Sequence, residues 1–172
     1  MGMFLTKYSM LNALGYGAEH NLLNETKRVL ARFKLFGLVL HDPKIHSKFN
    51  ESFAKSFERL DYITGKDFLF FGLTDPPKKW LQKDYRDYYK IWEIDHLFGP
   101  SNSYGTSDES ITTYTIANSL GIDYDDLPVI ILTNNFQFNQ FQVVKTCSEH
   151  LENQMQEIGY FCSQRDKYFS LI

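Results

Sequence analysis

The chain has 172 residues, which fits one domain that can bury its own core without disulfides or metals. Hydrophobic residues make up 43%, charged residues 23%, and the net charge is −3, so the composition argues against disorder and against a nucleic-acid partner. No apolar run approaches the roughly 18 residues of a membrane-spanning helix, and residues 1–10 lack a signal-peptide pattern. We therefore expect a cytoplasmic protein without a membrane partner.

The first part of the chain predicts an arm, a helix and a strand. Residues 1–18 carry glycines without clear periodicity and are expected to form an N-terminal arm. Residues 19–34 place apolar side chains at helical spacing and end in a basic turn, which predicts an N-terminal helix. The short apolar run at residues 35–41 stops at an Asp-Pro pair and indicates a buried strand.

The clearest predicted helix follows this strand. Asp42 is expected to be its N-cap, and Pro43 is expected to lie in its first turn. Residues 68–73 then predict a second buried strand, which ends at the turn signal TDPP. The apolar face of the helix is predicted from five residues at helical spacing: Ile45, Phe49, Phe53, Phe57 and Leu60.

A long insertion separates the second strand from the next helix. Residues 75–106 contain both tryptophans, several tyrosines and a Gly-Pro break, and a connection of this length in a compact domain is often functional. Thr106 and Glu109 form a capping box that starts a helix, and Gly121 can close it. Pro128 directly precedes the apolar run VIILT, which predicts a strand because proline is tolerated at a strand's first position.

The last predicted elements are a strand and a helix. Residues 141–146 lie close enough to the VIILT strand to form an antiparallel hairpin with it. Thr146 and Glu149 offer a second capping box, ahead of an amphipathic helix with the apolar stripe Leu151, Met155, Ile158 and Cys162. If one helix spans residues 148–163, Cys147 and Cys162 stand about 22 Å apart, so we predict that they do not pair within one chain.

This order of elements predicts an α/β fold with a mixed sheet of about four strands and helices on both faces. The succession, with a proline opening the hairpin strand, resembles the thioredoxin-like fold from about residue 19 to residue 163, which suggests a domain at residues 19–172. Pro128 matches the position where that superfamily places a cis-proline facing the active-site loop. A flavodoxin-like fold is the alternative, but the short link between the last two strands disfavours the parallel pairing that it needs.

The resemblance also carries an expectation about function. Catalytic members have a CxxC pair between the first strand and the following helix, where the helix N-terminus lowers a thiol pKa. The matching window here, HDPKIHSK at residues 41–48, contains no cysteine. The chain therefore resembles a thioredoxin-like member without the CxxC motif. Cysteine-free relatives serve as folding-complex, adaptor or assembly subunits, so the resemblance implies a binding role.

Three groups of residues are candidates for chemistry. His41, Asp42 and His46 cluster at the loop, where a histidine can be a general base or a metal ligand, although Asp42 is also explained as a cap. Asp75 with Asp95 and His96 offers the ligand types that zinc, manganese or iron take. Cys147 near the start of the last helix is either a lone nucleophile or a small buried residue.

The aromatic insertion is the strongest candidate for a binding surface. Its aromatic side chains alternate with lysines and arginines, a mixture rich in the anchor types of interface hot spots. Neighbouring acidic residues weaken the argument for nucleic-acid stacking, and packing over the sheet edge is the simpler alternative. The aromatic residues that we assign to this surface are Trp80, Tyr85, Tyr88 and Trp92.

The sequence therefore favours a non-catalytic thioredoxin-like module that binds another protein or a second copy of itself, as a subunit or adaptor of a larger assembly. The expected binding residues are those of the loop, Pro128 and the aromatic insertion, and no cofactor or metal is expected. The competing hypothesis is an enzyme. It would be either a thiol-dependent enzyme that uses Cys147 or a metal-assisted hydrolase that uses the His and Asp residues near His41 and Asp75.

Overall fold

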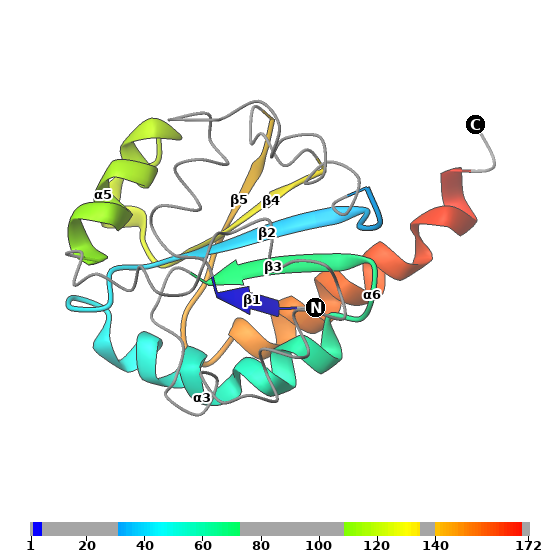
Figure 1. Ribbon diagram of the computed structural model, residues 1–172, viewed down its shortest axis with the longest axis horizontal. Coiled ribbons are helices and arrows are strands. Elements are labelled where there is room, and N and C mark those ends of the chain that lie inside the picture. The colour runs from blue at the N-terminus through cyan, green and yellow to red at the C-terminus, as the bar shows by residue number, and fades with distance from the viewer. Residues whose placement is uncertain (1, 5–30, 73–108, 135–139, 170–172) are drawn as a thin grey trace, which may run out of the picture.

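A computed structural model describes the chain at residues 2–4, 31–72, 109–134 and 140–169 (Figure 1). One mixed sheet has the strand order β1-β3-β2-β4-β5. β1 and β2 run parallel to β3, whereas β4 is antiparallel to β2 and β5 is antiparallel to β4. The strands are β1 (Gly2–Phe4), β2 (Leu35–Leu40), β3 (Phe68–Gly72), β4 (Val129–Thr133) and β5 (Gln142–Lys145).

The expected α/β fold with a mixed sheet is confirmed, and the sheet has one strand more than expected. Gly2–Phe4, which lies in the segment predicted to be an arm, pairs with β3 and extends the sheet on that side. The predicted hairpin is also confirmed, because β4 and β5 pair antiparallel with Val129 opposite Lys145. The rest of the arm and the insertion at residues 75–106 lie outside the described residues.

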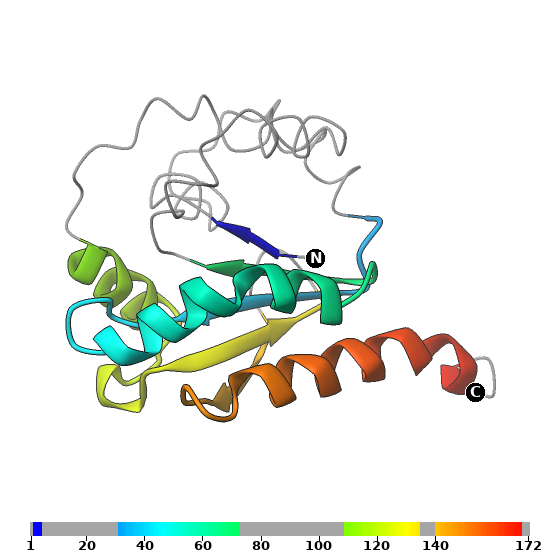
Figure 2. The same ribbon diagram turned by 90° about the horizontal axis from the view of Figure 1, so that it is seen from below.

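In the described ranges, three α-helices cover the two faces of the sheet (Figures 1 and 2). Helices α3 and α6 lie side by side on one face, and α5 packs on the other, as their shares in two separate hydrophobic clusters show. Helices on both faces were expected. The predicted N-terminal helix does not reach residue 34, since residues 31–34 form a turn and a bend. The helices are α3 (Ser47–Ile63), α5 (Glu109–Ser119) and α6 (Leu151–Phe169).

The predicted apolar face of α3 is confirmed for all of its residues but one. Phe49, Phe53, Phe57 and Leu60 are buried against the sheet, and the Phe53 and Phe57 rings meet edge to face at 5.5 Å. Ile45 is 66% exposed, because α3 begins two residues later, at Ser47. Residues 43–46 form a separate turn, so the periodicity of the helix does not apply to Ile45.

The end of α5 follows the expected geometry. Gly121 has a φ of +66°, a left-handed conformation that favours glycine. The amide of the next residue, Ile122, donates to the carbonyl of Ala117 at 2.9 Å, which satisfies one of the free carbonyls at the helix end. Gly121 therefore closes the helix as predicted, and the chain turns back towards β4 through the short 3-10 helix η3 (Tyr124–Asp126).

The predicted capping box before α6 is wrong. Residues 148–150 form a turn, and the helix begins at Leu151. The Thr146 hydroxyl is buried and has no hydrogen-bond partner among the described residues, whereas the Glu149 carboxyl group pairs with the Cys147 side chain. The Cys147 carbonyl accepts the amides of residues 150 and 151, so the backbone of the turn provides the cap that Thr146 was expected to supply.

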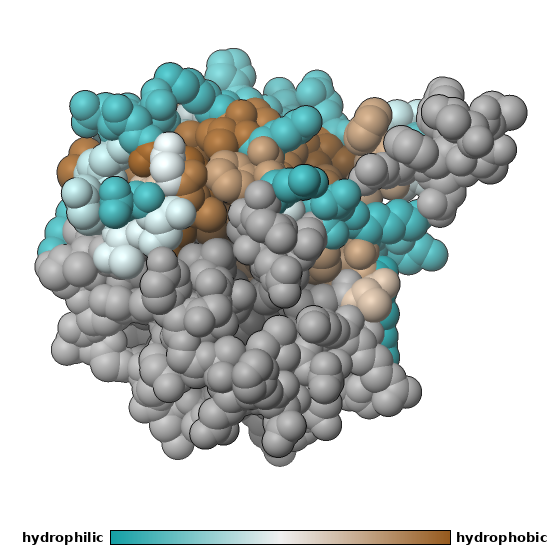
Figure 3. Space-filling model, turned by 90° about the horizontal axis from the view of Figure 1, so that it is seen from above, coloured by the Kyte–Doolittle hydropathy of each residue, from teal (hydrophilic) through white to brown (hydrophobic). Residues whose placement is uncertain are grey.

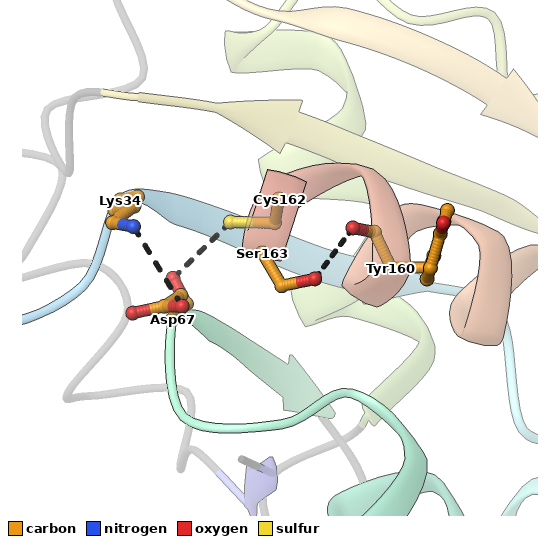
Figure 4. Close-up of polar contacts among 5 residues, drawn as sticks. All are labelled: Lys34, Asp67, Tyr160, Cys162 and Ser163. Atoms are coloured by element: carbon orange, nitrogen blue, oxygen red, sulfur yellow. Dashed lines mark hydrogen bonds and ion pairs between the residues drawn. The ribbon is translucent and has the colours of Figure 1, made fainter. Parts of the chain in front are cut away.

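The second half of α6 is anchored at the beginning of β3 (Figure 4). Cys162 is 2% exposed, and its Sγ donates a weak hydrogen bond to the Asp67 carbonyl at 3.5 Å. The same carbonyl accepts the amides of Lys34 and Leu35, at 2.8 and 3.3 Å. Cys162 thus belongs to the buried stripe of α6 as predicted, and Cys147 and Cys162 do not form a disulfide with each other, also as predicted.

Helices α3 and α6 approach each other at Gly159. A Cβ atom placed there would lie 2.9 Å from both the Cα and the carbonyl oxygen of Thr64. Alanine normally stabilises a helix interior by about 1 kcal/mol relative to glycine. At this contact the added methyl group must push backbone apart, and overpacking of this kind costs about 1 to 3 kcal/mol.

We therefore expect Gly159→Ala to lower the free energy of unfolding by about 1 to 2 kcal/mol, measured by urea denaturation. Ser163→Ala is the matched control, because Ser163 lies exposed in the same helix and its hydroxyl donates a hydrogen bond to the Tyr160 carbonyl of that helix. This control should be neutral or slightly stabilising. A stabilised Gly159→Ala chain would mean that the two helices are further apart.

Candidate functional site

The candidate site lies at one end of the sheet, where β2 ends and β4 begins. Leu40 pairs with Val129, so His41 and Pro128 are the next residues beyond this pair. The Leu127–Pro128 peptide bond is cis, and the Pro128 carbonyl accepts the Thr146 amide at 3.2 Å. Pro128 therefore stands at the entrance to β4, as predicted, where a proline is tolerated: its carbonyl accepts the Thr146 amide, and without an amide of its own it returns no second hydrogen bond to Thr146.

His41 is buried beneath the first turns of α3, with 1% of its surface exposed. Its Nε2 atom lies 3.0 Å from Oδ1 of Asn50, and its ring centre is 5.0 Å from that of Phe49 and 5.7 Å from that of Phe53. The Thr113 hydroxyl of α5 donates to the His41 carbonyl at 2.9 Å. These contacts hold the imidazole between the sheet and α3 and connect its backbone to the helix on the opposite face.

Burial lowers the pKa of His41 from 6.5 to about 4. The hydrogen bond with Asn50 opposes this shift, the neighbouring His46 adds to it, and Asp42 and the Val39 backbone favour the charged form. Nδ1 is buried without a well-formed hydrogen bond to any described residue. His41 is therefore a neutral, enclosed side chain at physiological pH, and it does not face solvent as a general base would.

Asp42 organises the turn between β2 and α3. It is 1% exposed, and its Oδ1 atom accepts the amides of Lys44 at 2.7 Å and Ile45 at 3.1 Å. Its Oδ2 atom accepts the Tyr124 hydroxyl, and its own amide donates to Nδ1 of His46 at 3.2 Å. The structure thus brings the three predicted loop residues together in one hydrogen-bonded network.

The prediction that Asp42 is the N-cap of α3 is wrong in its position. Asp42 caps the preceding turn, which is closed by a hydrogen bond from the His46 amide to the Asp42 carbonyl at 2.8 Å. His46 is the N-cap of α3 and makes no side-chain capping bond. Because the Asp42 side chain satisfies the amides of residues 44 and 45, the chain completes one separate turn before the helix starts.

Sequence reasoning missed three members of the network: Asn50, Thr113 and Tyr124. Asn50 lies one turn after His46 on α3, so its position offered a weak local signal. Thr113 is 72 positions from His41, and Tyr124 is 82 positions from Asp42. Only the folded sheet brings these residues together, and no local pattern in the chain indicates their pairing.

The outer side of this network exposes apolar groups beside acidic ones. Ile45 is 66% exposed and Tyr114 is 58% exposed, and the Tyr114 ring contacts that of Tyr124 at 5.8 Å. Asp123 and Asp125 of the adjoining η3 segment are also exposed. The arrangement can hold an apolar group of a ligand against a rigid base, with negative charge at one side.

Cys147 follows the residue that is hydrogen-bonded to Pro128, so it lies at the same end of the sheet. It is half-buried, and its hydrogen bond lowers the pKa of the Glu149 carboxyl group below its usual value. Across the described ranges, no three His, Cys, Asp or Glu side chains form a group that could hold a metal ion. The other predicted residues lie outside the described residues: Asp75, Trp80, Tyr85, Tyr88, Trp92, Asp95 and His96.

In the part of the chain that the structure describes, none of the helices combines the length and apolar character needed to cross a membrane. We compared the chain with models of known protein families, with curated proteins and with solved structures, and none of them matches it.

Proposed function

We propose that this chain is a non-catalytic, thioredoxin-like protein-binding module that acts as a subunit or adaptor of a larger assembly in the cytoplasm. Its contact surface is the end of the sheet around Ile45, Tyr114 and Pro128. A further contact surface, formed by the aromatic residues of the insertion, stays a prediction. A protein segment with an apolar anchor is the ligand that this surface fits best.

The arrangement of the sheet supports the thioredoxin-like assignment. Strands β2 and β3 run parallel and are connected through α3, while β4 and β5 form an antiparallel hairpin followed by α6. These are the features in which the order of elements resembles that fold. A proline in the cis form at the entrance to β4, beside the end of β2, supports it further.

The closed network at the end of β2 carries the proposal of a binding role. Catalytic thioredoxin-like proteins need an accessible thiol at the start of the helix that follows this strand. Here β2 is followed by His41 and Asp42, and each of them is 1% exposed. His41 is hydrogen-bonded to Asn50 of α3, and Asp42 is hydrogen-bonded to Tyr124 of η3. Side chains that are enclosed in this way stabilise the loop and hold Ile45 at the surface. They are poorly placed to exchange a proton with a substrate.

The contacts of Cys147 also favour binding over thiol chemistry. A nucleophilic cysteine is activated by a nearby base or cation that favours the thiolate. Cys147 is half-buried, and its hydrogen-bond partner is the Glu149 carboxyl group rather than a cationic side chain. His41, which follows the adjacent strand β2, is bonded to Asn50 instead.

The test uses the chain as immobilised bait in extract of the native cell. We expect Ile45→Glu to reduce recovery of the specific partner by about 30-fold, because loss of a hot spot costs about 2 kcal/mol. Tyr62→Glu is the matched control, since Tyr62 is 87% exposed at the far end of α3 and should leave recovery unchanged.

Two results would contradict the proposal. If Ile45→Glu and Tyr62→Glu retain the same proteins as the unmodified chain, this end of the sheet is not the contact surface. If the chain reduces disulfides catalytically and Cys147→Ser abolishes that turnover, the thiol-enzyme alternative is correct. Ile45→Glu and Tyr62→Glu should unfold at the same urea concentration as the unmodified chain, because both side chains are exposed.

A further inference from the structure

Strand β5 lies at one edge of the sheet, and no described strand pairs with its outer side. It is the last strand in the order β1-β3-β2-β4-β5, and three of its four residues are exposed. Val143 is 44% exposed although it is a large apolar residue in a strand. Figure 3 views the molecule from the side on which β5 lies and shows hydrophobic residues gathered at the surface there, beside hydrophilic ones. An edge of this kind is a template for pairing with another strand.

The hydrogen bonds to β4 fix the direction of each backbone group in β5. The Thr146 amide donates to the Pro128 carbonyl, so this pair is hydrogen-bonded within the ladder. Hydrogen-bonded and non-hydrogen-bonded pairs alternate along antiparallel strands. Val144 opposite Ile130 is therefore hydrogen-bonded to β4, whereas the amide and carbonyl of Val143 point away from the sheet.

One neighbour of Val143 on this open edge is already occupied. The Lys145 carbonyl also points outwards, and it accepts the Gln154 side-chain amide of α6 at 3.0 Å. The Val143 amide and carbonyl have no partner among the described residues. On the described part of this edge, the backbone groups that remain available to pair with another strand are thus those of Val143.

We propose that two copies of this chain pair through β5, antiparallel, about a two-fold axis that passes beside Val143. Each Val143 amide would donate to the Val143 carbonyl of the other copy, which gives two hydrogen bonds from one residue of each chain. The result is one continuous sheet across the dimer. This surface is separate from the candidate site, and the proposal does not depend on the proposed function.

The side chains of β5 favour a second copy as the occupant. In this register Val143 faces Val143 of the other copy, and β-branched pairs directly opposite each other stabilise a sheet. Lys145 faces Phe141 of the other copy, so the two lysines do not meet. Lys145 is further neutralised by Asp126, whose Oδ1 atom lies 2.5 Å from its Nζ. Self-pairing therefore brings apolar groups together and places no like charges opposite one another.

The oligomeric state, measured by sedimentation equilibrium of the full chain, tests the proposal. The unmodified chain is expected to form dimers whose fraction rises with concentration. Val143→Pro should weaken association by about 4- to 100-fold, because each dimer loses two donors and each net hydrogen bond contributes a factor of about 2 to 10. The variant should still fold, since proline is tolerated on an edge strand where the amide faces solvent.

Two further variants keep the test informative if Val143→Pro does not fold. Val143→Lys keeps the amide but sets two ammonium groups opposite each other on the axis, so its dimer should weaken, and added salt should partly restore it. Val143→Thr is the matched control, because it keeps both the amide and the β-branched shape, and it should dimerise as the unmodified chain does.

Three results would overturn the proposal. At about 1 mM, even a dimer with a binding free energy of only about 4 kcal/mol would be substantially populated. A chain that stays monomeric at this concentration therefore does not pair with itself, and the edge is left to a strand of another protein. A dimer that persists in both Val143→Pro and Val143→Lys uses another surface. A dimer that Ile45→Glu dissociates uses the candidate site instead, so failure here is distinguishable from failure of the proposed function.

Discussion

Asp42→Ala is expected to lower the free energy of unfolding by about 3 kcal/mol, because it removes the acceptor for two backbone amides and one hydroxyl group. The amides of Lys44 and Ile45 lose their Oδ1 partner, and the Tyr124 hydroxyl loses its Oδ2 partner in a partly buried position. Loss of a cap alone typically costs about 1 kcal/mol, and an unpaired buried polar group costs about 1 to 3 kcal/mol.

Asp42→Asn separates the role of the acceptor from that of the rest of the side chain. Its amide oxygen can still accept the two backbone amides, and its NH2 group can donate to the Tyr124 hydroxyl oxygen. We expect a loss of about 1 kcal/mol, measured with Asp42→Ala by urea denaturation at pH 7. Equal losses in the two variants would show that these hydrogen bonds do not stabilise the turn.

The stability of the protein should fall as the pH is lowered from about 6.5 to about 4, because His41 stays neutral in the folded chain. Its pKa drops from 6.5 to about 4 on folding, so between these values the unfolded chain binds a proton that the folded chain does not. The stabilisation that this pKa difference provides is fully present above the pKa of the unfolded chain, and it is lost as the pH falls towards the pKa of the folded chain. The shift corresponds to about 3 kcal/mol at full extent.

His41→Gln removes the titrating group while keeping an amide that can bond to Asn50. Unfolding free energies of both chains are measured at pH 7 and at pH 4.5. The unmodified chain should lose about 2 to 3 kcal/mol more than the variant over this interval, and contributions of the carboxyl groups cancel in the difference. If both chains lose the same amount, the imidazole is accessible to protons in the folded state.

The sequence predicts the core of this fold well because its signals there are local. The stripe from Phe49 to Leu60 repeats at helical spacing, and burial of these side chains against the sheet follows directly from that pattern. Pro128 likewise restricts the chain to a strand entrance, where the structure has it. Such predictions depend on the chemistry of one short segment, which the rest of the molecule does not alter.

The candidate site is harder to predict because its members meet only in the folded sheet. The position of Asp42 before a proline is typical of an N-cap, and only the contact with Tyr124 shows that it also connects distant segments. For His41, the sequence allows a general base or metal ligand and also an ordinary histidine beside a helix start, and it does not indicate the enclosed imidazole of the structure. Its neighbours on α3 and α5 decide which environment it has, and the spacing of residues along the chain does not encode those neighbours.

The pairing of β2 with β4 has a consequence for synthesis of the chain on the ribosome. Leu40 pairs with Val129, so one edge of β2 stays without its partner until residues 41–128 have been made. At about 5 to 20 residues per second, this interval lasts several seconds. During that time β2, α3 and β3 can assemble locally, while the apolar edge of β2 remains open to other nascent chains. Co-translational protection by chaperones would therefore matter most for this central strand.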